Sequence, residues 1–284
     1  MNLMLSGFAD EISPVTAEQF AHLKELGMSY FEPRGINGKN IADLSDEEVT
    51  ALKKQMREYK ISASSIGSPI GKIDIGDDFD AHLAKLRRVI RTAKMLDTQF
   101  IRVFSFFMPA NEKDLHRDEA LFRMNAMAEE AKREGVVLLH ENEKDIYGET
   151  ARRCRDIFES VGSEHLRAVF DMANFVQCGQ TVFPDAYYEI EEYIEYVHIK
   201  DAQKDGAVVP AGQGDGCVRE IIRALSDRGY CGFLSLEPHL GSFEGLAALE
   251  KDDKMTKLSK SDAGKFTMAF EALMKIIKEV EQNG

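Results

Sequence analysis

Residues 166–202 read LRAVFDMANFVQCGQTVFPDAYYEIEEYIEYVHIKDA, and this stretch decides the fold. It contains two short apolar runs, one ending at Asp171 and the other reaching His198, and a segment of helical periodicity lies between them around 184–193. Short apolar runs that alternate with helical segments are typical of buried parallel strands connected by helices. The stretch therefore predicts a strand, a helix and a second strand, with a side chain able to bind a metal ion near the end of each strand.

The same alternation of a short strand and a longer helix continues through the whole chain. Predicted strands lie within residues 3–8, 29–35, 60–67, 99–106, 135–142, 166–174, 195–202 and 232–239. Predicted helices lie at about 14–26, from 45 onward, 78–96, 114–134, 149–160, around 184–193, 216–228 and 262–281. The second of these helices opens with a capping-box pattern that runs from Ser45 to Glu48. Five predicted helices end near a residue suited to a turn before the next strand: Gly27, Asp97, Gly135, Gly162 and Gly229.

Eight strand–helix units in 284 residues indicate an α/β fold, a single (β/α)8 TIM barrel that occupies residues 1–284. The alternative is a doubly wound open sheet, which has fewer strands and favours a glycine-rich turn after the first strand. The first predicted turn, over residues 7–10, reads GFAD and lacks that feature. One connection is long: residues 240–261 follow the eighth strand, and we interpret them as a lid or an interface insertion.

Composition limits the class of protein and its partners. The chain is 44% hydrophobic and 30% charged, which is typical of a globular protein and excludes a disordered or disulfide-stapled chain. Its net charge of −13 and the lack of a run dense in Lys and Arg argue against a nucleic-acid partner. No apolar run approaches the length of a membrane span, and the four cysteines show no paired spacing. We expect a cytoplasmic protein with reduced thiols and no membrane partner, and the long loops also allow a homo-oligomer.

Residues able to bind a metal stand near the ends of the last four predicted strands: Glu141, Asp171, His198 and Glu237. Each follows the previous one by 27–39 residues, the length of one strand–helix unit, so a barrel brings them to neighbouring positions at its mouth. Two glutamates, one aspartate and one histidine form an oxygen and nitrogen set that suits Mn²⁺, Co²⁺, Mg²⁺ or Zn²⁺. Taken singly, each carboxylate can instead be a helix cap, and His198 can be a core histidine. The joint pattern predicts one divalent metal ion bound by all four residues.

The segments that carry these residues are LLHENE, VFDMANF, VHIKDA and LSLEPH, and PAGQGDG lies between the last two at 210–216. Together they resemble the xylose isomerase-like TIM-barrel superfamily, in particular its sugar phosphate isomerase/epimerase family, over essentially the whole chain. That family includes ketose 3-epimerases, hydroxypyruvate isomerase and inosose dehydratase. By analogy with the epimerases, the resemblance implies that all four residues bind one divalent metal ion. It also implies that Glu141 and Glu237 face each other across the substrate as proton-transfer groups.

Two carboxylates beside a metal ion suit the removal of a proton next to a carbonyl. One carboxylate close to the carbon-bound proton acts as the base, a divalent cation stabilises the ene-diolate, and a second carboxylic acid returns the proton. We therefore expect an isomerase or epimerase of carbohydrate metabolism that acts on a small-molecule sugar, sugar phosphate or keto-polyol. The alternatives are a dehydratase similar to inosose dehydratase, an endonuclease-IV-like phosphodiesterase and a non-catalytic sugar-binding barrel.

Further candidate substrate residues lie at or near the same strand ends: Glu32, Arg102, His140, Asn174, Lys200 and Lys204. Glu32 and Arg102 can alternatively form an internal ion pair at the barrel rim, and the lysines can be solvated loop residues. Asn174 stands where the epimerases that the sequence resembles usually have a substrate-binding histidine, so the exact sugar and the reaction stay open. The glycine-rich sequence GQGDG, residues 212–216, is a weak phosphate motif, because a simple turn explains it equally well.

Overall fold

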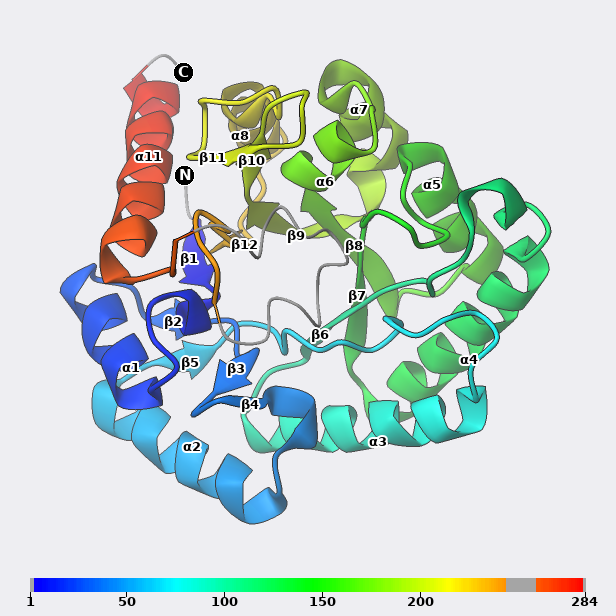
Figure 1. The fold of residues 1–284 in the computed structure, drawn as a ribbon, viewed down its shortest axis with the longest axis horizontal. Helices are drawn as coiled ribbons and strands as arrows, with labels where there is room; N and C mark the ends of the chain where they lie inside the picture. The colour runs from blue at the N-terminus through cyan, green and yellow to red at the C-terminus, as the bar shows by residue number, and fades with distance from the viewer. Residues whose placement is uncertain (1–2, 244–258, 283–284) are drawn as a thin grey trace.

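Eight parallel strands close into a barrel, and helices cover its outside (Figure 1). The computed structural model describes residues 3–243 and 259–282. Six strands form one sheet in the order β1-β12-β9-β8-β7-β6, and β2 pairs with β5. The strands of the barrel are β1 (Met4–Gly7), β2 (Tyr30–Phe31), β5 (Ser62–Ala63), β6 (Phe100–Val103), β7 (Val137–Glu141), β8 (Leu166–Asp171), β9 (Ile194–Ile199) and β12 (Phe233–Leu236). The predicted (β/α)8 barrel is confirmed.

Backbone hydrogen bonds join the two sheets and close the barrel. The Glu32 N–H donates to Gly7 O at 2.9 Å, which joins the end of β2 to β1. The Ile66 N–H donates to Phe100 O at 2.9 Å, which joins the chain after β5 to β6. Both β2 and β5 have two residues, fewer than the sequence predicts. Pro33 explains the early end of β2, because proline has no N–H to donate to a strand ladder.

The helices that cover the barrel are α1 (Thr16–Glu25), α2 (Asp46–Tyr59), α3 (Phe79–Met95), α4 (Arg117–Glu134), α5 (Ala151–Val161), α7 (Tyr187–Ile190), α8 (Val218–Asp227) and α11 (Ala263–Gln282). The predicted capping box of Ser45 and Glu48 is present at the start of α2. All five predicted turn residues after helices have a positive φ, between 59° and 74°, the region that favours glycine. In the described part of the chain, no helix combines the length and the apolar character that crossing a bilayer requires.

The continuous helix predicted around 184–193 is wrong. The segment is divided into η4 (Val182–Ala186), α7 and η5 (Glu191–Tyr193). Pro184 lies inside it, and a proline removes one helical hydrogen bond and crowds the preceding turn. A short helix that was not predicted, α6 (Met172–Gln177), starts directly after β8 and ends that strand earlier than expected.

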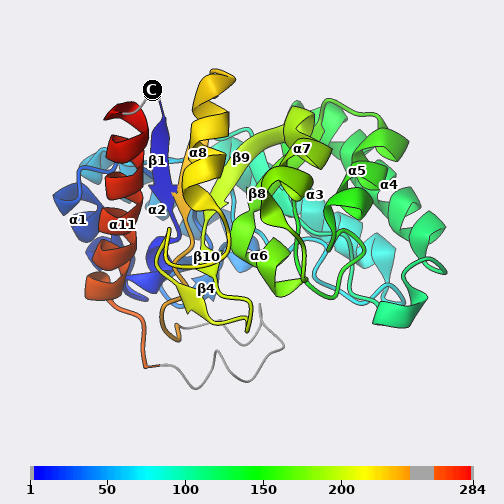
Figure 2. The same cartoon turned by 90° about the horizontal axis from the view of Figure 1, so that it is seen from above.

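The loops that follow the strands carry short elements that the sequence did not predict. They are η1 (Ala9–Glu11), β3 (Gly35–Ile36), β4 (Lys39–Asn40), η2 (Ile41–Asp43), η3 (Ala110–Glu112), β10 (Asp201–Ala202) and β11 (Val208–Val209). The labels β4 and β10 in Figure 2 mark the end of the barrel at which these loops gather. Most of the insertion predicted at 240–261 falls within residues 244–258, which lie outside the described residues.

Alternation along the strands decides which side chains point into the barrel. A separate apolar cluster contains one residue from each of β7, β8, β9 and β12: Leu139, Val169, Tyr196 and Phe233. Successive side chains of a strand point to opposite faces, so the residues two positions further along face the same interior. They are Glu141, Asp171, His198 and Ser235. The apolar cluster therefore forms a floor beneath a layer of polar side chains.

His82 on α3 is a buried histidine outside that polar layer. Its Nε2 accepts a hydrogen bond of 2.7 Å from the Gly71 N–H, so the ring is neutral in this contact. Burial lowers the pKa of His82 from 6.5 to about 4. The positive charges of Lys85 and Arg123 lower it further, and Asp77 opposes them.

This contact predicts a loss of stability in mild acid. Below pH 6.5 the unfolded chain binds a proton at His82, while the folded chain stays neutral until the pH approaches 4. Between these values the free energy of unfolding should fall by up to about 3 kcal/mol because of this one group. Urea unfolding at several pH values, compared between the protein and His82→Gln, isolates the effect. An identical pH dependence in the two proteins would contradict the prediction.

Candidate functional site

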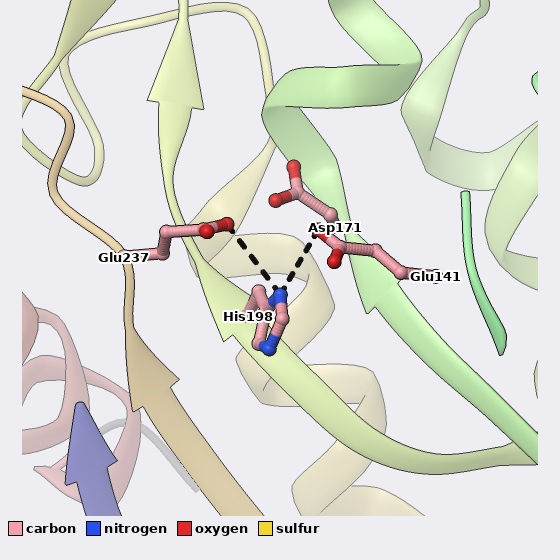
Figure 3. Close-up of side chains that lie close together, drawn as sticks. All are labelled: Glu141, Asp171, His198 and Glu237. Carbon is pink, nitrogen blue, oxygen red and sulfur yellow. Dashed lines mark hydrogen bonds and ion pairs between the residues drawn. The ribbon is translucent and has the colours of Figure 1, made fainter. Parts of the chain in front are cut away.

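The barrel brings the four predicted metal-binding residues together (Figure 3). Glu141 ends β7, Asp171 ends β8, His198 lies near the end of β9, and Glu237 directly follows β12. One ligand atom of each residue lies within 4.8 Å of the corresponding atoms of the other three, and all four residues are buried. The cluster has the composition of a site for a hard or borderline divalent cation.

His198 is held in one orientation by carboxylates on both sides of its ring. Nε2 lies 3.2 Å from Glu32 Oε2, and Nδ1 lies 3.1 Å from Glu141 Oε1 and 3.5 Å from Glu237 Oε2. Burial alone would lower the pKa of His198, but Glu141 and Glu32 raise it to about 10. A metal-binding histidine commonly donates its other ring N–H to a carboxylate, and Glu32 occupies that position. Nδ1 is therefore the nitrogen that faces the cluster.

Glu32 lies behind His198 and does not pair with Arg102, the alternative considered for it. Its Oε2 accepts hydrogen bonds from Ser235 Oγ at 2.7 Å and from the Tyr196 hydroxyl at 3.0 Å. Arg102 instead contacts the cluster, with Nη1 at 3.3 Å from Glu141 Oε2. Glu32 is thus a positioning residue for His198.

Asp171 is both a helix cap and a member of the cluster. Its Oδ1 accepts a hydrogen bond of 2.8 Å from the Asn174 N–H at the start of α6. Its Oδ2 turns the other way and lies 3.1 Å from Lys200 Nζ. Burial raises the pKa of Asp171 to about 7, and the positive charge of Lys200 opposes this rise. The cap leaves the second oxygen for the cluster, so the two interpretations of this residue do not compete.

Asn174 and Lys200, both predicted as substrate residues, also lie against the cluster. Asn174 Nδ2 donates to Glu141 Oε1 at 3.3 Å and to Asn142 O at 2.9 Å. Lys200 Nζ lies 3.2 Å from Glu237 Oε2. Burial alone would raise the pKa of Glu237, but Lys200 and the other nearby cationic groups hold it well below its ordinary value.

Two carboxylate oxygens of the cluster have unused acceptor capacity. Glu141 Oε2 and Asp171 Oδ2 are buried and accept no hydrogen bond from any described residue, although Arg102 and Lys200 lie nearby as ion-pair partners. A buried carboxylate oxygen that accepts no hydrogen bond is unfavourable, and coordination to a metal cation stabilises it. The residues therefore fit a divalent metal ion.

Arg34, which the sequence analysis missed, holds the fourth member of the cluster. Its Nη1 donates to Glu237 Oε1 at 3.0 Å, and its Nε and Nη2 donate to the two oxygens of Asp10 at 2.8 and 3.0 Å. The guanidinium lies between the rings of Phe8 and Phe243, with Cζ 4.3 Å from each centroid. Its position two residues after Glu32 was an available signal, because alternate residues of an extended segment share a side.

The other predicted substrate residues lie away from the cluster. His140 Nε2 lies 2.9 Å from Ser105 Oγ, and its ring packs edge-on against Phe158. Burial lowers the pKa of His140 to about 3. Lys204 is exposed in the loop between β10 and β11, where its backbone N–H donates to the Asp215 carboxylate. Neither side chain makes a contact with the four clustered residues among the interactions of the described chain.

The glycine-rich loop at 212–216 uses its amides within the protein. The N–H groups of Gly212, Gly214 and Gly216 each donate to the carboxylate of Asp201 at 2.9 Å, and the Ala202 N–H does the same. A Cβ on Gly214 would lie 2.4 Å from Asp201 Oδ1, so this position needs glycine. The loop is built around an internal carboxylate, and its three glycine amides are already engaged.

Comparisons with known proteins agree with this architecture. The family model described as "Xylose isomerase-like TIM barrel" matches residues 20–257. A search of curated proteins finds no match to the chain. Among solved structures, a D-tagatose 3-epimerase-like protein is 16% identical with a TM-score of 0.77, and 99% of each chain is covered.

Two further solved structures contain a metal ion. An IOLI protein with a bound zinc atom is 15% identical with a TM-score of 0.76, over 98% of this chain and 99% of the other. A xylose isomerase-like TIM barrel protein from Mycobacterium smegmatis, in complex with magnesium, is 18% identical with a TM-score of 0.69, over 97% of each chain. At these identities the likeness shows the shared fold.

Proposed function

The chain belongs to the xylose isomerase-like TIM-barrel family, and from that premise we propose that it is a metal-dependent isomerase or epimerase of a small sugar, sugar phosphate or keto-polyol. One observation carries the proposal. Glu141 and Glu237 come from β7 and from the end of β12, on either side of His198, and both have a carboxylate oxygen within 3.5 Å of its Nδ1. Two buried carboxylates that converge from opposite sides suit the removal and return of one proton.

The reaction begins with a hydrogen on the carbon next to the substrate carbonyl. A divalent cation held by Glu141, Asp171, His198 and Glu237 would stabilise the negative charge that develops on the carbonyl oxygen. Glu237, which the nearby cations keep ionised, enters as the carboxylate and accepts the proton. The other glutamate, Glu141, enters as the carboxylic acid and delivers its own proton to the opposite face, which inverts the carbon, and proton exchange with solvent restores both groups after each turnover. Return of the proton to the neighbouring carbon converts an aldose to a ketose.

The surrounding residues keep the two glutamates distinct and in place. Arg34 and Lys200 hold one oxygen each of Glu237, so its carboxylate has a fixed plane. Asn174 donates to Glu141 Oε1, which leaves Oε2 as the oxygen of Glu141 that accepts no hydrogen bond among the described residues. The burial of all four clustered residues excludes bulk water and strengthens each electrostatic interaction.

The test is exchange of the substrate's α-proton in D₂O. The purified chain, stripped with EDTA and then supplied with Mn²⁺, Co²⁺ or Mg²⁺, is incubated with a panel of ketoses, and the α-proton is followed by ¹H NMR. We expect exchange with at least one ketose, and we expect EDTA to lower its rate by at least about tenfold, because the developing charge loses its stabilisation. Metal binding in calorimetry without exchange of any α-proton would overturn the proposal.

A further inference from the structure

One edge of the Arg102 guanidinium has no hydrogen-bond partner among the described residues. Arg102 lies on β6 and is 2% exposed. Its Nη1 contacts Glu141 Oε2 at 3.3 Å and Glu237 Oε1 at 3.4 Å. Its Nε and Nη2 are buried and donate to no described residue. Arginine stays charged at all ordinary pH values, so this buried cation keeps two donor nitrogens without an acceptor among the described residues.

Arg34 shows which group the Nε and Nη2 edge of an arginine binds in this protein. In Arg34 the Nε and Nη2 donors grip both oxygens of the Asp10 carboxylate, at 2.8 and 3.0 Å, and Nη1 points to Glu237. Arg102 repeats this arrangement in part, since its Nη1 also contacts Glu237. The difference is that no carboxylate of the described chain lies on its Nε and Nη2 edge.

Aromatic rings hold the plane of the Arg102 guanidinium. Its Cζ lies 4.8 Å from the centroid of Phe8 and 5.0 Å from that of Phe104. The stacked rings favour the cation but provide no acceptor oxygen in the guanidinium plane. Both nitrogens are buried and lack an acceptor among the described residues, which is unfavourable, so a ligand that supplies acceptor oxygens stabilises them. A fixed, desolvated fork with two parallel donors is suited to bidentate recognition.

We propose that the Nε and Nη2 edge of Arg102 binds a carboxylate of the substrate, so that the substrate is a keto-sugar acid. This inference rests on the proposed function and names its substrate class. Two coplanar oxygens with a single negative charge match the fork, as Asp10 does on Arg34. Arginine forks also bind phosphate, so the experiment includes a phosphate ester as a competing probe.

The position of Arg102 links the carboxylate to the reacting carbon. The same guanidinium touches both proposed proton-transfer residues through Nη1. A substrate carboxylate bound to Nε and Nη2 is therefore separated from Glu141 and Glu237 only by the guanidinium group itself. Anchoring a remote group at a fixed distance orients the reacting carbon, which converts binding energy into rate.

The experiment compares three probes that share one carbon skeleton. D-fructuronate has a carboxylate where D-fructose has a terminal hydroxymethyl group, and D-fructose 6-phosphate has a phosphate ester there. Dissociation constants are measured by calorimetry on the Mn²⁺-loaded protein. We expect D-fructuronate to bind at least about tenfold more tightly than D-fructose, because a charge-assisted bidentate pair forms. Equal affinities, tighter binding of D-fructose 6-phosphate than of D-fructuronate, or no binding of D-fructuronate at millimolar concentration would overturn the proposal.

Variants separate Arg102 from the metal as the source of the preference. In Arg102→Gln the ratio of the D-fructose to D-fructuronate dissociation constants should fall to about one, and Arg102→Lys should restore only part of it because lysine lacks the fork. Arg123→Lys is the control. Arg123 is a buried arginine on α4 that pairs with Glu119 and lies outside the cluster, so the ratio should stay within about twofold of the wild-type value. A preference that survives in Arg102→Gln would come from the metal ion and would overturn the proposal.

Failure of this inference is distinguishable from failure of the proposed function. Binding preference is measured without turnover, whereas the proposed function is tested by α-proton exchange in D₂O. A preference for D-fructuronate without exchange would leave the role of Arg102 standing and overturn the isomerase proposal. Exchange with neutral ketoses and no preference for D-fructuronate would do the reverse.

Discussion

Replacement of Glu237 by glutamine is expected to lower the rate of α-proton exchange by about 10²–10⁴-fold, and Glu141→Gln is expected to have the same effect. Glutamine keeps the size of the side chain but can neither accept nor return a proton at this position. It also replaces a charged side chain of the proposed metal site by a neutral amide, which should weaken the affinity for a divalent cation. The measurement is the exchange rate in D₂O at saturating Mn²⁺, with bound metal determined in parallel.

The control for these variants is Glu130→Gln. Glu130 is a buried glutamate on α4 that pairs with Arg87 and Arg133, so it tests the removal of a buried carboxylate outside the cluster. We expect its exchange rate to stay within about twofold of the wild-type rate, since Glu130 is not one of the proton-transfer groups. If Glu141→Gln and Glu237→Gln bind metal and exchange the α-proton as fast as this control, neither glutamate is a proton-transfer group.

Replacement of Asp201 by alanine is expected to lower the free energy of unfolding by about 3–4 kcal/mol. Asp201 is fully buried and accepts backbone hydrogen bonds from Ala202, Gly212, Gly214 and Gly216, each at 2.9 Å. Alanine leaves four N–H groups without their acceptor in a loop whose shape depends on them. The penalty for each unsatisfied donor is partly relieved because the loop reaches the surface, which sets the estimate below a simple sum.

Urea unfolding checks this prediction, with two variants for comparison. Asp201→Asn keeps one acceptor oxygen and should lose roughly half as much stability. Asp215→Ala removes an exposed carboxylate of the same loop that accepts one hydrogen bond from the Lys204 N–H, and it should lose no more than about 1 kcal/mol. Equal unfolding midpoints for Asp201→Ala and Asp215→Ala would show that the loop does not depend on the buried carboxylate.

The sequence predicted the structure well where a local pattern, such as apolar periodicity or a turn residue after a helix, determines the conformation. The order of strands and helices followed from apolar periodicity, and the positive φ of residues such as Gly135 and Asp97 followed from their place after helices. The sequence also predicted that four polar residues lie close together, because their spacing matches one strand–helix unit and parallel strands of a barrel end at the same face. They are Glu141, Asp171, His198 and Glu237.

The sequence was least informative where partners are distant along the chain. Arg34 meets Asp10 and Glu237, which come from the loop after β1 and from the end of β12, and no local pattern connects them. Glu32 was predicted as a candidate substrate residue, and nothing in the sequence indicated its contact with His198 across the barrel. The helix predicted around 184–193 failed for a local reason, because Pro184 interrupts the helix although the apolar spacing of the segment is helical.

Among the described residues, an apolar floor lies below the polar cluster and fills that end of the barrel interior; it is formed by Leu139, Val169, Tyr196 and Phe233. Because the floor closes the interior below the polar layer, a molecule bound at the cluster leaves by the path through which it entered. Substrate would therefore bind, and product would dissociate, at the same end of the barrel. We therefore expect a substitution in the described loops at the open end of the barrel to change the association and dissociation rates of a ligand of the cluster together.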